Sequence, residues 1–197
     1  MKLIFSFDDY SPLNYQLADL IEKYGLVENT IFYIAPIDEN QIRGLHNRGF
    51  EIGNHTYSHL ILQYIRPEIV KKEIEEANKI IKNITGYNPK KFCYPRGRWD
   101  EVSKKIIKQY FEEARTTKVF NYKEPEDLLE TGTSIHFSYP RREYEGRDWL
   151  ELAKEYYKKA EREENGRFEC WGHAEEAMRF NEFGNLEKFL KYVKENR

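Results

Sequence analysis

Residues 50–59 read Phe50-Glu51-Ile52-Gly53-Asn54-His55-Thr56-Tyr57-Ser58-His59, and they largely decide how the chain folds and what it can bind. The short run at residues 50–53 predicts a strand. His55 and His59 then lie four residues apart, so both imidazoles can point the same way from one turn. A carboxylate from a distant strand end would complete three ligands for a divalent metal and leave one position open for water. This arrangement is typical of metal-dependent hydrolases.

Apolar runs of strand length alternate with helical patterns along the whole chain. We predict strands at residues 2–7, 30–35, 50–53, 91–94, 113–117, 133–139 and 168–171. Helices are predicted at residues 13–24, around 42–45, and at 67–85, 102–110, 149–160 and 186–193. Strands that alternate with helices imply a parallel sheet covered by helices, and seven such units fit a closed or nearly closed barrel better than a small open sheet.

The polar candidates for a functional site all follow predicted strands. They are Asp8 and Asp9 after the first strand, His55 and His59 after the third, Pro95-Arg96-Gly97 after the fourth, and His173 after the last. In (β/α) barrels the chemistry gathers at the carboxyl ends of the strands. We therefore expect these side chains to meet on one rim of the barrel.

Length and composition limit the classes of protein to which the chain can belong. Its 197 residues suit one domain with a substantial core, and 40% of them are hydrophobic, as in globular proteins. Lys and Arg number 32 against 34 Asp and Glu, so no basic excess points to nucleic acid or to an anionic membrane. The sequence contains no run of about 18 apolar residues, which is the length needed to span a membrane. We predict no nucleic-acid partner and no membrane span, and the sequence leaves the oligomeric state open.

The first residues and the two cysteines favour an intracellular protein. Residues 1–8 are too short and too soon acidic for a signal peptide, and we interpret them as a strand inside the fold. Cys93 and Cys170 lack CxxC spacing, so we interpret them as small buried hydrophobic residues in preference to a disulfide or redox pair. The predicted location is cytoplasmic.

With these positions in place, the chain resembles the polysaccharide deacetylases, the NodB-homology domain of carbohydrate esterase family four. The resemblance runs from Ser6 to about Val193 and rests on four motifs that agree in order and spacing. They are Ser6-Phe7-Asp8-Asp9, similar to T/S-F-D-D; His55-Thr56-Tyr57-Ser58-His59, similar to H-S/T-x-x-H; Tyr94-Pro95-Arg96-Gly97, similar to a P-x-G core; and Trp171-Gly172-His173 at a late strand end. The resemblance implies an α/β fold, a distorted (β/α) barrel with about seven parallel strands, as a single catalytic domain over residues 1–197.

The resemblance also implies roles for the site residues. Asp8 would be the general base and His173 the general acid, while Asp9, His55 and His59 would bind the metal. The metal of the family is usually zinc, and these ligand types also suit cobalt or nickel. The implied reaction removes an N-acetyl, or sometimes an O-acetyl, group from a sugar.

The chemistry of such a hydrolysis agrees with these residue types. A bound metal polarises the acetyl carbonyl and lowers the pKa of a water toward about 7. Adjacent carboxylates can divide the work, one binding the metal and one accepting a proton. An imidazole such as His173 titrates in the range needed to protonate the leaving amine. For the oxyanion we predict a backbone N–H of the turn Pro95-Arg96-Gly97, and we favour the backbone of Arg96 over its side chain.

Two positions depart from the family pattern. Cys93 stands where the family has an arginine that bonds to the catalytic aspartate. We hypothesise that Arg115, at the end of a neighbouring strand, supplies this cation. Ala174 stands where an aspartate usually follows the last histidine, so an acidic helper must come from Glu175 or Glu176.

Several other residues have both a structural and a functional interpretation. Trp99 and Trp171 flank motifs, so each can stack on a sugar face or pack in the core. His136 is predicted to lie in the middle of a strand and to pack in the core. The dipeptide Asp148-Trp149 matches a further family motif, but it also suits the start of a helix.

The function predicted from the sequence is that of a metal-dependent deacetylase acting on an N-acetylated sugar or a small glycoconjugate. Two alternatives stay open. One is hydrolysis of an amide bond outside sugars, because Cys93 departs from the family pattern. The other is a binding protein that keeps the metal or sugar site without turnover, although a pure binder needs neither the base Asp8 nor the acid His173.

Overall fold

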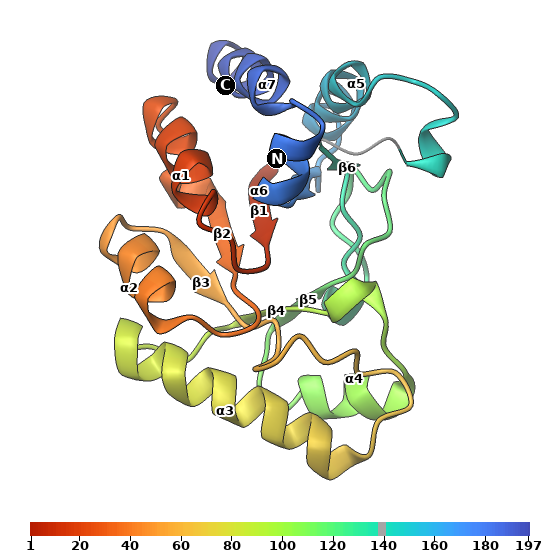
Figure 1. The fold of residues 1–197 in the computed structure, drawn as a ribbon. Coiled ribbons are helices and arrows are strands. Elements are labelled where there is room, and N and C mark those ends of the chain that lie inside the picture. The colour runs from red at the N-terminus through yellow and green to blue at the C-terminus, as the bar shows by residue number, and fades with distance from the viewer. Residues whose placement is uncertain (138–140) are drawn as a thin grey trace.

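The computed structural model describes residues 1–137 and 141–197, and its strands form two parallel sheets (Figure 1). The strands of the described residues are β1 (Lys2–Asp8), β2 (Thr30–Tyr33), β3 (Glu51–Gly53), β4 (Lys91–Cys93), β5 (Glu113–Arg115), β6 (Ile135–His136) and β7 (Arg167–Gly172). One sheet has the order β3-β2-β1-β7-β6, and the other consists of β4 and β5. All pairs among these strands are parallel.

Two isolated bridges join the sheets into a ring that follows the order of the chain. Asn54, directly after β3, bridges in parallel to Phe92 in β4. On the other side Arg115 in β5 bridges in parallel to Thr131, and the chain continues from Thr131 to β6. Because the ring depends on isolated bridges at these two places, the barrel is distorted there. The predicted fold, a distorted (β/α) barrel with seven parallel strands, is confirmed.

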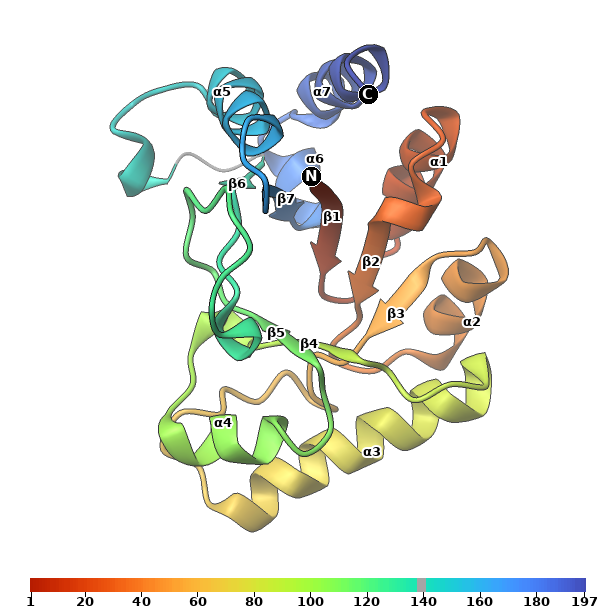
Figure 2. The same cartoon turned by 180° about the vertical axis from the view of Figure 1, so that it is seen from behind.

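Helices cover the outside of this ring (Figures 1 and 2). They are α1 (Asn14–Lys23), α2 (Glu39–Asn47), α3 (Pro67–Thr85), α4 (Glu101–Ile107), α5 (Trp149–Glu161), α6 (Ala174–Arg179) and α7 (Phe183–Glu195). Short 3₁₀ turns lie at η1 (Val27–Asn29), η2 (Pro95–Gly97), η3 (Leu128–Glu130) and η4 (Arg142–Tyr144). Within the described part of the chain, no helix is both long and apolar enough to cross a membrane.

The helix boundaries have local causes. The Asp100 carboxylate accepts the Ser103 backbone N–H at 2.8 Å, and the Ser103 hydroxyl accepts the Asp100 N–H, which gives a capping box at the start of α4. Gly86 ends α3 with a φ of 82°, a left-handed conformation that suits glycine. Asp148 caps α5, and Trp149 beside it is buried in the main core. This dipeptide therefore starts a helix, as its structural interpretation requires.

Several elements differ from their prediction, and three of them are instructive. Of the strand predicted at residues 133–139, β6 covers only Ile135 and His136, the two residues that pair with β7, while residues 138 and 139 lie outside the described residues. Helix α4 ends at Ile107, three residues before the predicted end. Helix α6 was not predicted, because six residues are too few to show a helical period.

Apolar side chains fill the space between the ring and its helices. The main core cluster joins β1 and β7 to α1, α5 and α7, and includes Phe5 and Phe189. A second cluster joins β4 to α3 and α4 around Phe92. Cys93 and Cys170 are buried free thiols, as predicted. Because burying a large apolar side chain contributes about 1.5–3 kcal/mol, these outer clusters stabilise the barrel and leave room for polar groups inside it.

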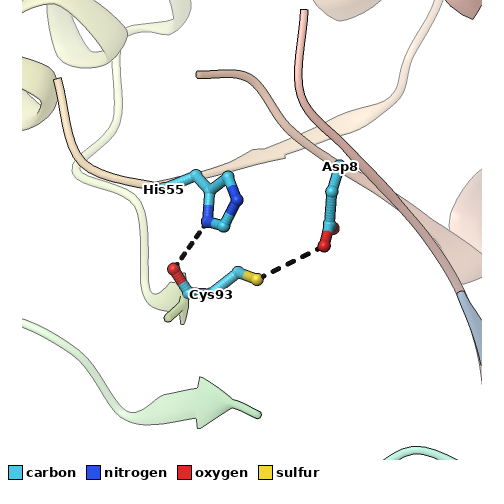
Figure 3. A group of neighbouring side chains, drawn as sticks. All are labelled: Asp8, His55 and Cys93. Carbon is cyan, nitrogen blue, oxygen red and sulfur yellow. Dashed lines mark hydrogen bonds between the residues drawn. The ribbon is translucent and has the colours of Figure 1, made fainter. Parts of the chain in front are cut away.

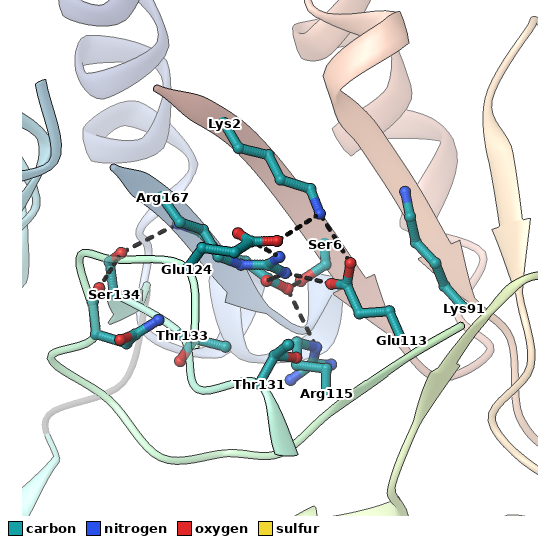
Figure 4. A network of polar contacts seen from close by, with 12 residues as sticks. Lys2, Ser6, Lys91, Glu113, Arg115, Glu124, Thr131, Thr133, Ser134 and Arg167 are labelled. Atoms are coloured by element: carbon teal, nitrogen blue, oxygen red, sulfur yellow. Dashed lines mark hydrogen bonds and ion pairs between the residues drawn. The ribbon is translucent and has the colours of Figure 1, made fainter. Parts of the chain in front are cut away.

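A chain of alternating charges, here called the charge ladder, crosses the interior of the ring, and Figure 4 shows its members Arg115, Arg167, Glu113 and Lys2. From the carboxyl ends of the strands to their amino ends its members are Asp8, Arg115, Glu169, Arg167, Glu113 and Lys2. Arg115 Nε lies 3.4 Å from Glu169 Oε1, and Arg167 Nη2 lies 2.7 Å from Glu169 Oε2. Both arginine side chains are only 1% exposed. Charges buried this deeply are tolerated only when they are paired, so the ladder is a structural requirement of the ring.

We expect Glu113→Gln to lower the free energy of unfolding at pH 7 and to have little effect in strong acid. Burial acts to raise the pKa of Glu113, but Arg167 and Lys2 outweigh it and hold the pKa at about 2, below the ordinary value of 4.5. The native carboxylate therefore contributes stability above about pH 4.5, which is lost as the pH falls toward 2. The expected loss at pH 7 is about 3 kcal/mol, measured by urea unfolding across this pH range.

Glu124→Gln is the matched control. Its side chain is 31% exposed and lies 3.3 Å from the same two cations, Lys2 and Arg167. In this control the free energy of unfolding should fall by less than about 1 kcal/mol at every pH, because solvent screens a partly exposed pair. If the loss in Glu113→Gln stayed constant between pH 7 and pH 3, the assigned pairing would be wrong.

Candidate metal centre and active site

A cavity of about 280 Å³ lies at the carboxyl ends of the strands and collects most of the predicted site residues. Its walls are formed by Asp8, Asp9, His55, His59, Arg96, Thr117, Trp171, His173 and Glu176. These residues come from or directly follow strands β1, β3, β4, β5 and β7. Thr117 is the lining residue that sequence reasoning missed, although it is the last residue of a predicted strand. The other eight were all candidates in the sequence.

Asp9, His55 and His59 have the geometry of three ligands to one ion. Asp9 Oδ1 lies 3.6 Å from His55 Nε2 and 3.5 Å from His59 Nε2. Two ligands of a tetrahedral zinc, each about 2.0–2.1 Å from the ion, are about 3.3 Å apart. Asp9 Oδ1 is also buried without a hydrogen-bond partner among the described residues, which is costly unless a cation binds there. The two nitrogens and the oxygen therefore fit a divalent metal.

The local backbone and a hydrogen bond aim these ligands. Asp9 and His59 have φ values of 68° and 63°, a region that few residues other than glycine adopt. His55 Nδ1 lies 2.7 Å from the carbonyl oxygen of Cys93, which leaves Nε2 for the metal (Figure 3). Burial lowers the pKa of His55 despite the nearby carboxylates of Asp8 and Asp9. The ring is thus held in the neutral form that binds metals.

Asp8 lies beside this triad of ligands and is an ionised carboxylate. Arg115 Nη2 donates to both carboxylate oxygens, and Cys93 Sγ lies 3.6 Å from Asp8 Oδ2 (Figure 3). Burial acts to raise the pKa of Asp8, but the charge and hydrogen bonds of Arg115, together with the charge of His173, outweigh it and hold the pKa below its usual value. The carboxylate can therefore accept a proton at neutral pH.

Arg115 lies at the end of β5 and reaches Asp8 from there, as our hypothesis requires. Its Nη2 also lies 2.9 Å from Cys93 Sγ, and its guanidinium lies over the Trp171 ring at 4.6 Å from the centroid. The small thiol of Cys93 leaves space for a cation from the neighbouring strand. The structure thus places a cation on Asp8, and the effect of that cation on turnover stays a prediction.

His173 and Glu176 form another wall of the cavity. His173 Nδ1 lies 2.8 Å from Glu176 Oε2, and its Nε2 lies 3.7 Å from Asp9 Oδ2. Burial acts to lower the pKa of His173, but the bond to Glu176 and the charges of Asp8, Glu176 and Asp9 raise it above its ordinary value. Glu175 instead accepts a hydrogen bond from the Ser11 hydroxyl at 2.7 Å. Of the two candidate acidic helpers, Glu176 is the one beside His173.

His136 supports this wall through Glu176, a role that sequence reasoning missed. Its Nε2 lies 3.1 Å from Glu176 Oε2, so one carboxylate holds both His136 and His173. The expected burial is correct, since only 2% of His136 is exposed. Its place in the middle of a strand is wrong, because β6 ends at this residue. The rule that links strand ends to the site would have found His136 if the strand had been predicted with its true length.

The turn η2 contains the residues predicted to bind the oxyanion. Pro95 has no N–H, and the Gly97 N–H donates to the Tyr94 carbonyl at 2.7 Å. The Arg96 N–H has no acceptor among the described residues, and Arg96 is the member of the turn that lines the cavity. Gly97 is needed here, since its φ is 66° and a Cβ would lie 2.4 Å from Thr117 Oγ1. Within the turn, Arg96 is thus the candidate donor.

The two tryptophans predicted for sugar stacking lie in different places. Trp171 lines the cavity but is only 4% exposed, because its ring covers the guanidinium of Arg115. Trp99 does not line the cavity. It packs against Tyr94 with ring centroids 6.0 Å apart and lies below Lys104, next to the core cluster of β4 and α4. The structure does not bring Trp99 to this site, and it favours the packing role for both rings.

Comparison with known proteins gives the family. The sequence profile of the polysaccharide deacetylases matches residues 2–111, so the chain belongs to the polysaccharide deacetylase family. It is 30% identical over 115 residues to YxkH of Bacillus subtilis, which is named for this family; the match covers 54% of this chain and 41% of that protein. It is 29% identical over 101 residues to a peptidoglycan-N-acetylglucosamine deacetylase of Bacillus cereus, a match that covers 49% of this chain and 36% of that protein. The matches span less than half the length of these two relatives.

Solved structures share the fold over nearly the whole chain. A family 4 acetyl xylan esterase from Clostridium thermocellum, in complex with a cobalt ion, superposes with a TM-score of 0.67 and 18% identity, over 98% of this chain and 84% of that one. A family 4 carbohydrate esterase from Streptomyces lividans, in complex with acetate, superposes with a TM-score of 0.62 and 16% identity. This match covers 98% of this chain and 88% of that one. These likenesses confirm the fold of the ring and its helices.

We expect Asp9→Ala to lower the affinity for Zn²⁺ or Co²⁺ by more than about 100-fold, because it removes one of three ligands. Titration calorimetry on protein stripped of metal measures this affinity. Asp8→Asn is the control, since it leaves Asp9, His55 and His59 in place and should bind the metal within about tenfold of the original protein. Equal losses in the two variants would contradict the ligand assignment.

Proposed function

We propose that this protein is a metal-dependent hydrolase that removes an acetyl group from an N-acetylated sugar or glycoconjugate. The observation that carries the proposal is the buried, unpartnered Asp9 Oδ1 facing two imidazoles, with Asp8 and His173 in the same cavity. A binding protein would need the three ligands but neither the base nor the acid. Membership of the polysaccharide deacetylase family supports the same conclusion. We also propose that residues 1–197 act as one catalytic domain.

The chain's own residues perform the proton transfers. When bound by Asp9, His55 and His59, a metal supplies polarisation of the acetyl carbonyl and a lowered pKa for a water. Asp8 accepts a proton from the attacking water, because its carboxylate is ionised and lines the cavity. His173, which is held by Glu176 through Nδ1, donates a proton from Nε2 to the leaving amine nitrogen.

The oxyanion of the tetrahedral intermediate needs a donor that is already in place. The Arg96 backbone N–H has no acceptor among the described residues and sits in a turn fixed by the contact of Gly97 with Thr117. A preorganised donor of this kind stabilises developing negative charge without reorganisation. We assign this role to the Arg96 N–H.

Zinc is the proposed metal, with cobalt and nickel as alternatives. Two imidazole nitrogens and one carboxylate oxygen suit all three ions, and a site with three protein ligands keeps a position open for catalysis. Metal analysis of protein purified without added metal identifies the native ion. The cytoplasmic location stays a prediction.

The proposal predicts acetate release from N-acetylglucosamine oligomers by the metal-loaded protein, and loss of that release on treatment with a chelator. Asp8→Asn should lower kcat by at least about 100-fold while metal content is unchanged, because the variant lacks the base but keeps the ligands. An enzymatic acetate assay and metal analysis on the same samples give both quantities. Metal binding without acetate release from any acetylated sugar would instead favour a different amide substrate or a binding protein.

Arg115→Ala should lower kcat by more than about tenfold with little change in KM, because Asp8 loses the cation that holds it ionised and in position. Arg115→Lys is the matched variant, since it keeps a charge in the same place and should recover part of the rate. Circular dichroism measures the folded fraction, so that each rate refers to folded enzyme. Full turnover in folded Arg115→Ala would disprove the role.

A further inference from the structure

Arg96 lines the catalytic cavity, and its guanidinium is unpaired among the described residues. Its side chain has no hydrogen bond, ion pair or ring contact with any of residues 1–137 and 141–197, and it is exposed. The arginines that do bind carboxylates in the described residues are Arg48, Arg115, Arg141, Arg147 and Arg167. Among the cavity's lining residues, Arg96 is the one with a permanent positive charge.

The carboxylates that share this cavity already have other partners. Arg115 neutralises Asp8, and Glu176 binds both His136 and His173. Asp9 faces His55 and His59 as a ligand of the proposed metal. Arg96 therefore has no countercharge left in the cavity, although three carboxylates form part of the wall.

The charge balance of the loaded site is positive. Asp8, Asp9 and Glu176 carry three negative charges, and Arg96 and Arg115 carry two positive ones. A divalent ion would turn the remaining negative charge into one net positive charge, before any protonation of His173. Without Arg96 the loaded site would be neutral, so the Arg96 guanidinium accounts for its net positive charge. Such a cavity raises the local concentration of anions.

The backbone holds Arg96 in a fixed place. Its φ and ψ are 56° and 17°, a left-handed conformation that is strained for a residue with a Cβ. The turn is closed by the bond from the Gly97 N–H to the Tyr94 carbonyl, and Gly97 packs directly on Thr117. The guanidinium consequently extends from a backbone that is fixed at the cavity wall.

The cavity has room for a group larger than an acetamide. A second hollow of about 300 Å³, whose lining includes Glu175 and Arg179, shares Asp8, Asp9, His173 and Glu176 with it, so the two hollows adjoin at these residues. The second hollow is lined in part by Tyr10, which is 44% exposed and can offer a face to a sugar ring. A sugar that places its acetyl group at the metal site can therefore carry a further substituent to Arg96.

We propose that the substrate is an acidic acetylated sugar whose carboxylate or phosphate group pairs with the Arg96 guanidinium. This inference rests on the proposed deacetylase function and names the substrate class within it. Arginine binds both kinds of anion through paired hydrogen bonds, so the structure assigns an anionic group and the experiment distinguishes the two.

Binding is measured by calorimetry on metal-loaded protein in the Asp8→Asn background, so that no substrate is consumed. The ligands are N-acetylglucosamine, N-acetylmuramic acid with its carboxylate, and N-acetylglucosamine 6-phosphate. We expect at least one acidic sugar to bind about tenfold more tightly than the neutral one, as for a charge-assisted hydrogen bond. Arg96→Gln should remove this preference, whereas Arg96→Lys should keep part of it. Every comparison uses the same background, so the charge lost at Asp8 cancels.

Arg98→Gln is the matched control. Arg98 is exposed, lies two residues further along and lines neither hollow, so its loss should leave the preference for acidic sugars unchanged. Kinetic measurements on the same variants in the active enzyme, which keeps Asp8, give the ratio of kcat/KM for acidic and neutral sugars. That ratio should fall about tenfold in Arg96→Gln.

Three results would overturn the inference. The first is equal binding of neutral and acidic sugars by protein that keeps Arg96. The second is a preference for acidic sugars that survives Arg96→Gln. The last is an equal loss of affinity for neutral and acidic sugars in Arg96→Gln. The last result would assign the guanidinium to the acetyl group itself. Absence of acetate release from every sugar would defeat the proposed function, while the binding comparison would still decide the role of Arg96.

Discussion

The ion pair between Asp8 and Arg115 is the interaction on which the barrel and its site both depend. It joins the end of β1 to the end of β5 across the interior of the ring, and neither side chain is more than 3% exposed. Breaking a buried pair of this kind leaves an uncompensated charge, which costs about 3–5 kcal/mol. The same contact holds the pKa of Asp8 low. Folding and the proposed chemistry are therefore coupled at one guanidinium.

The charge ladder explains how a buried arginine can stay so well oriented. Arg115 contacts Glu169, and the Ser6 hydroxyl and Arg167 contact the same carboxylate at 2.8 and 2.7 Å (Figure 4). Each charge thus has opposite charges on its neighbours, down to Lys2 at the amino end of β1. Because the ring closes through isolated bridges at two places, these side-chain contacts also help to hold β1, β5 and β7 together. Apolar packing stabilises the outside of the barrel, and paired charges organise its inside.

The fold and most of the cavity were predictable because both follow from local patterns. Strand ends such as Asp8-Asp9 and His55 to His59 stand out in the sequence, and parallel strands bring them to one rim. The ladder was not predictable, because Arg167 and Glu169 alternate with the apolar Phe168 and Cys170, as in a strand with one face in water. In a barrel that polar face points inward, and only the partners on other strands reveal it. His136 was missed for a related reason, since the length of β6 depends on its pairing with β7.

Arg96 and Arg115 show how similar positions near strand ends acquire opposite roles. Arg115 is a strand residue whose side chain enters the ring, where burial demands a partner and Asp8 provides it. Arg96 lies beyond the end of β4 in a turn with positive φ, so its side chain stays at the mouth of the cavity, where water satisfies it and no partner is required. A buried cation can only tune the groups around it, because exchange of its partner is too costly. An exposed cation can exchange water for a ligand at little cost, which is why we propose substrate selection for Arg96 and activation of the base for Arg115.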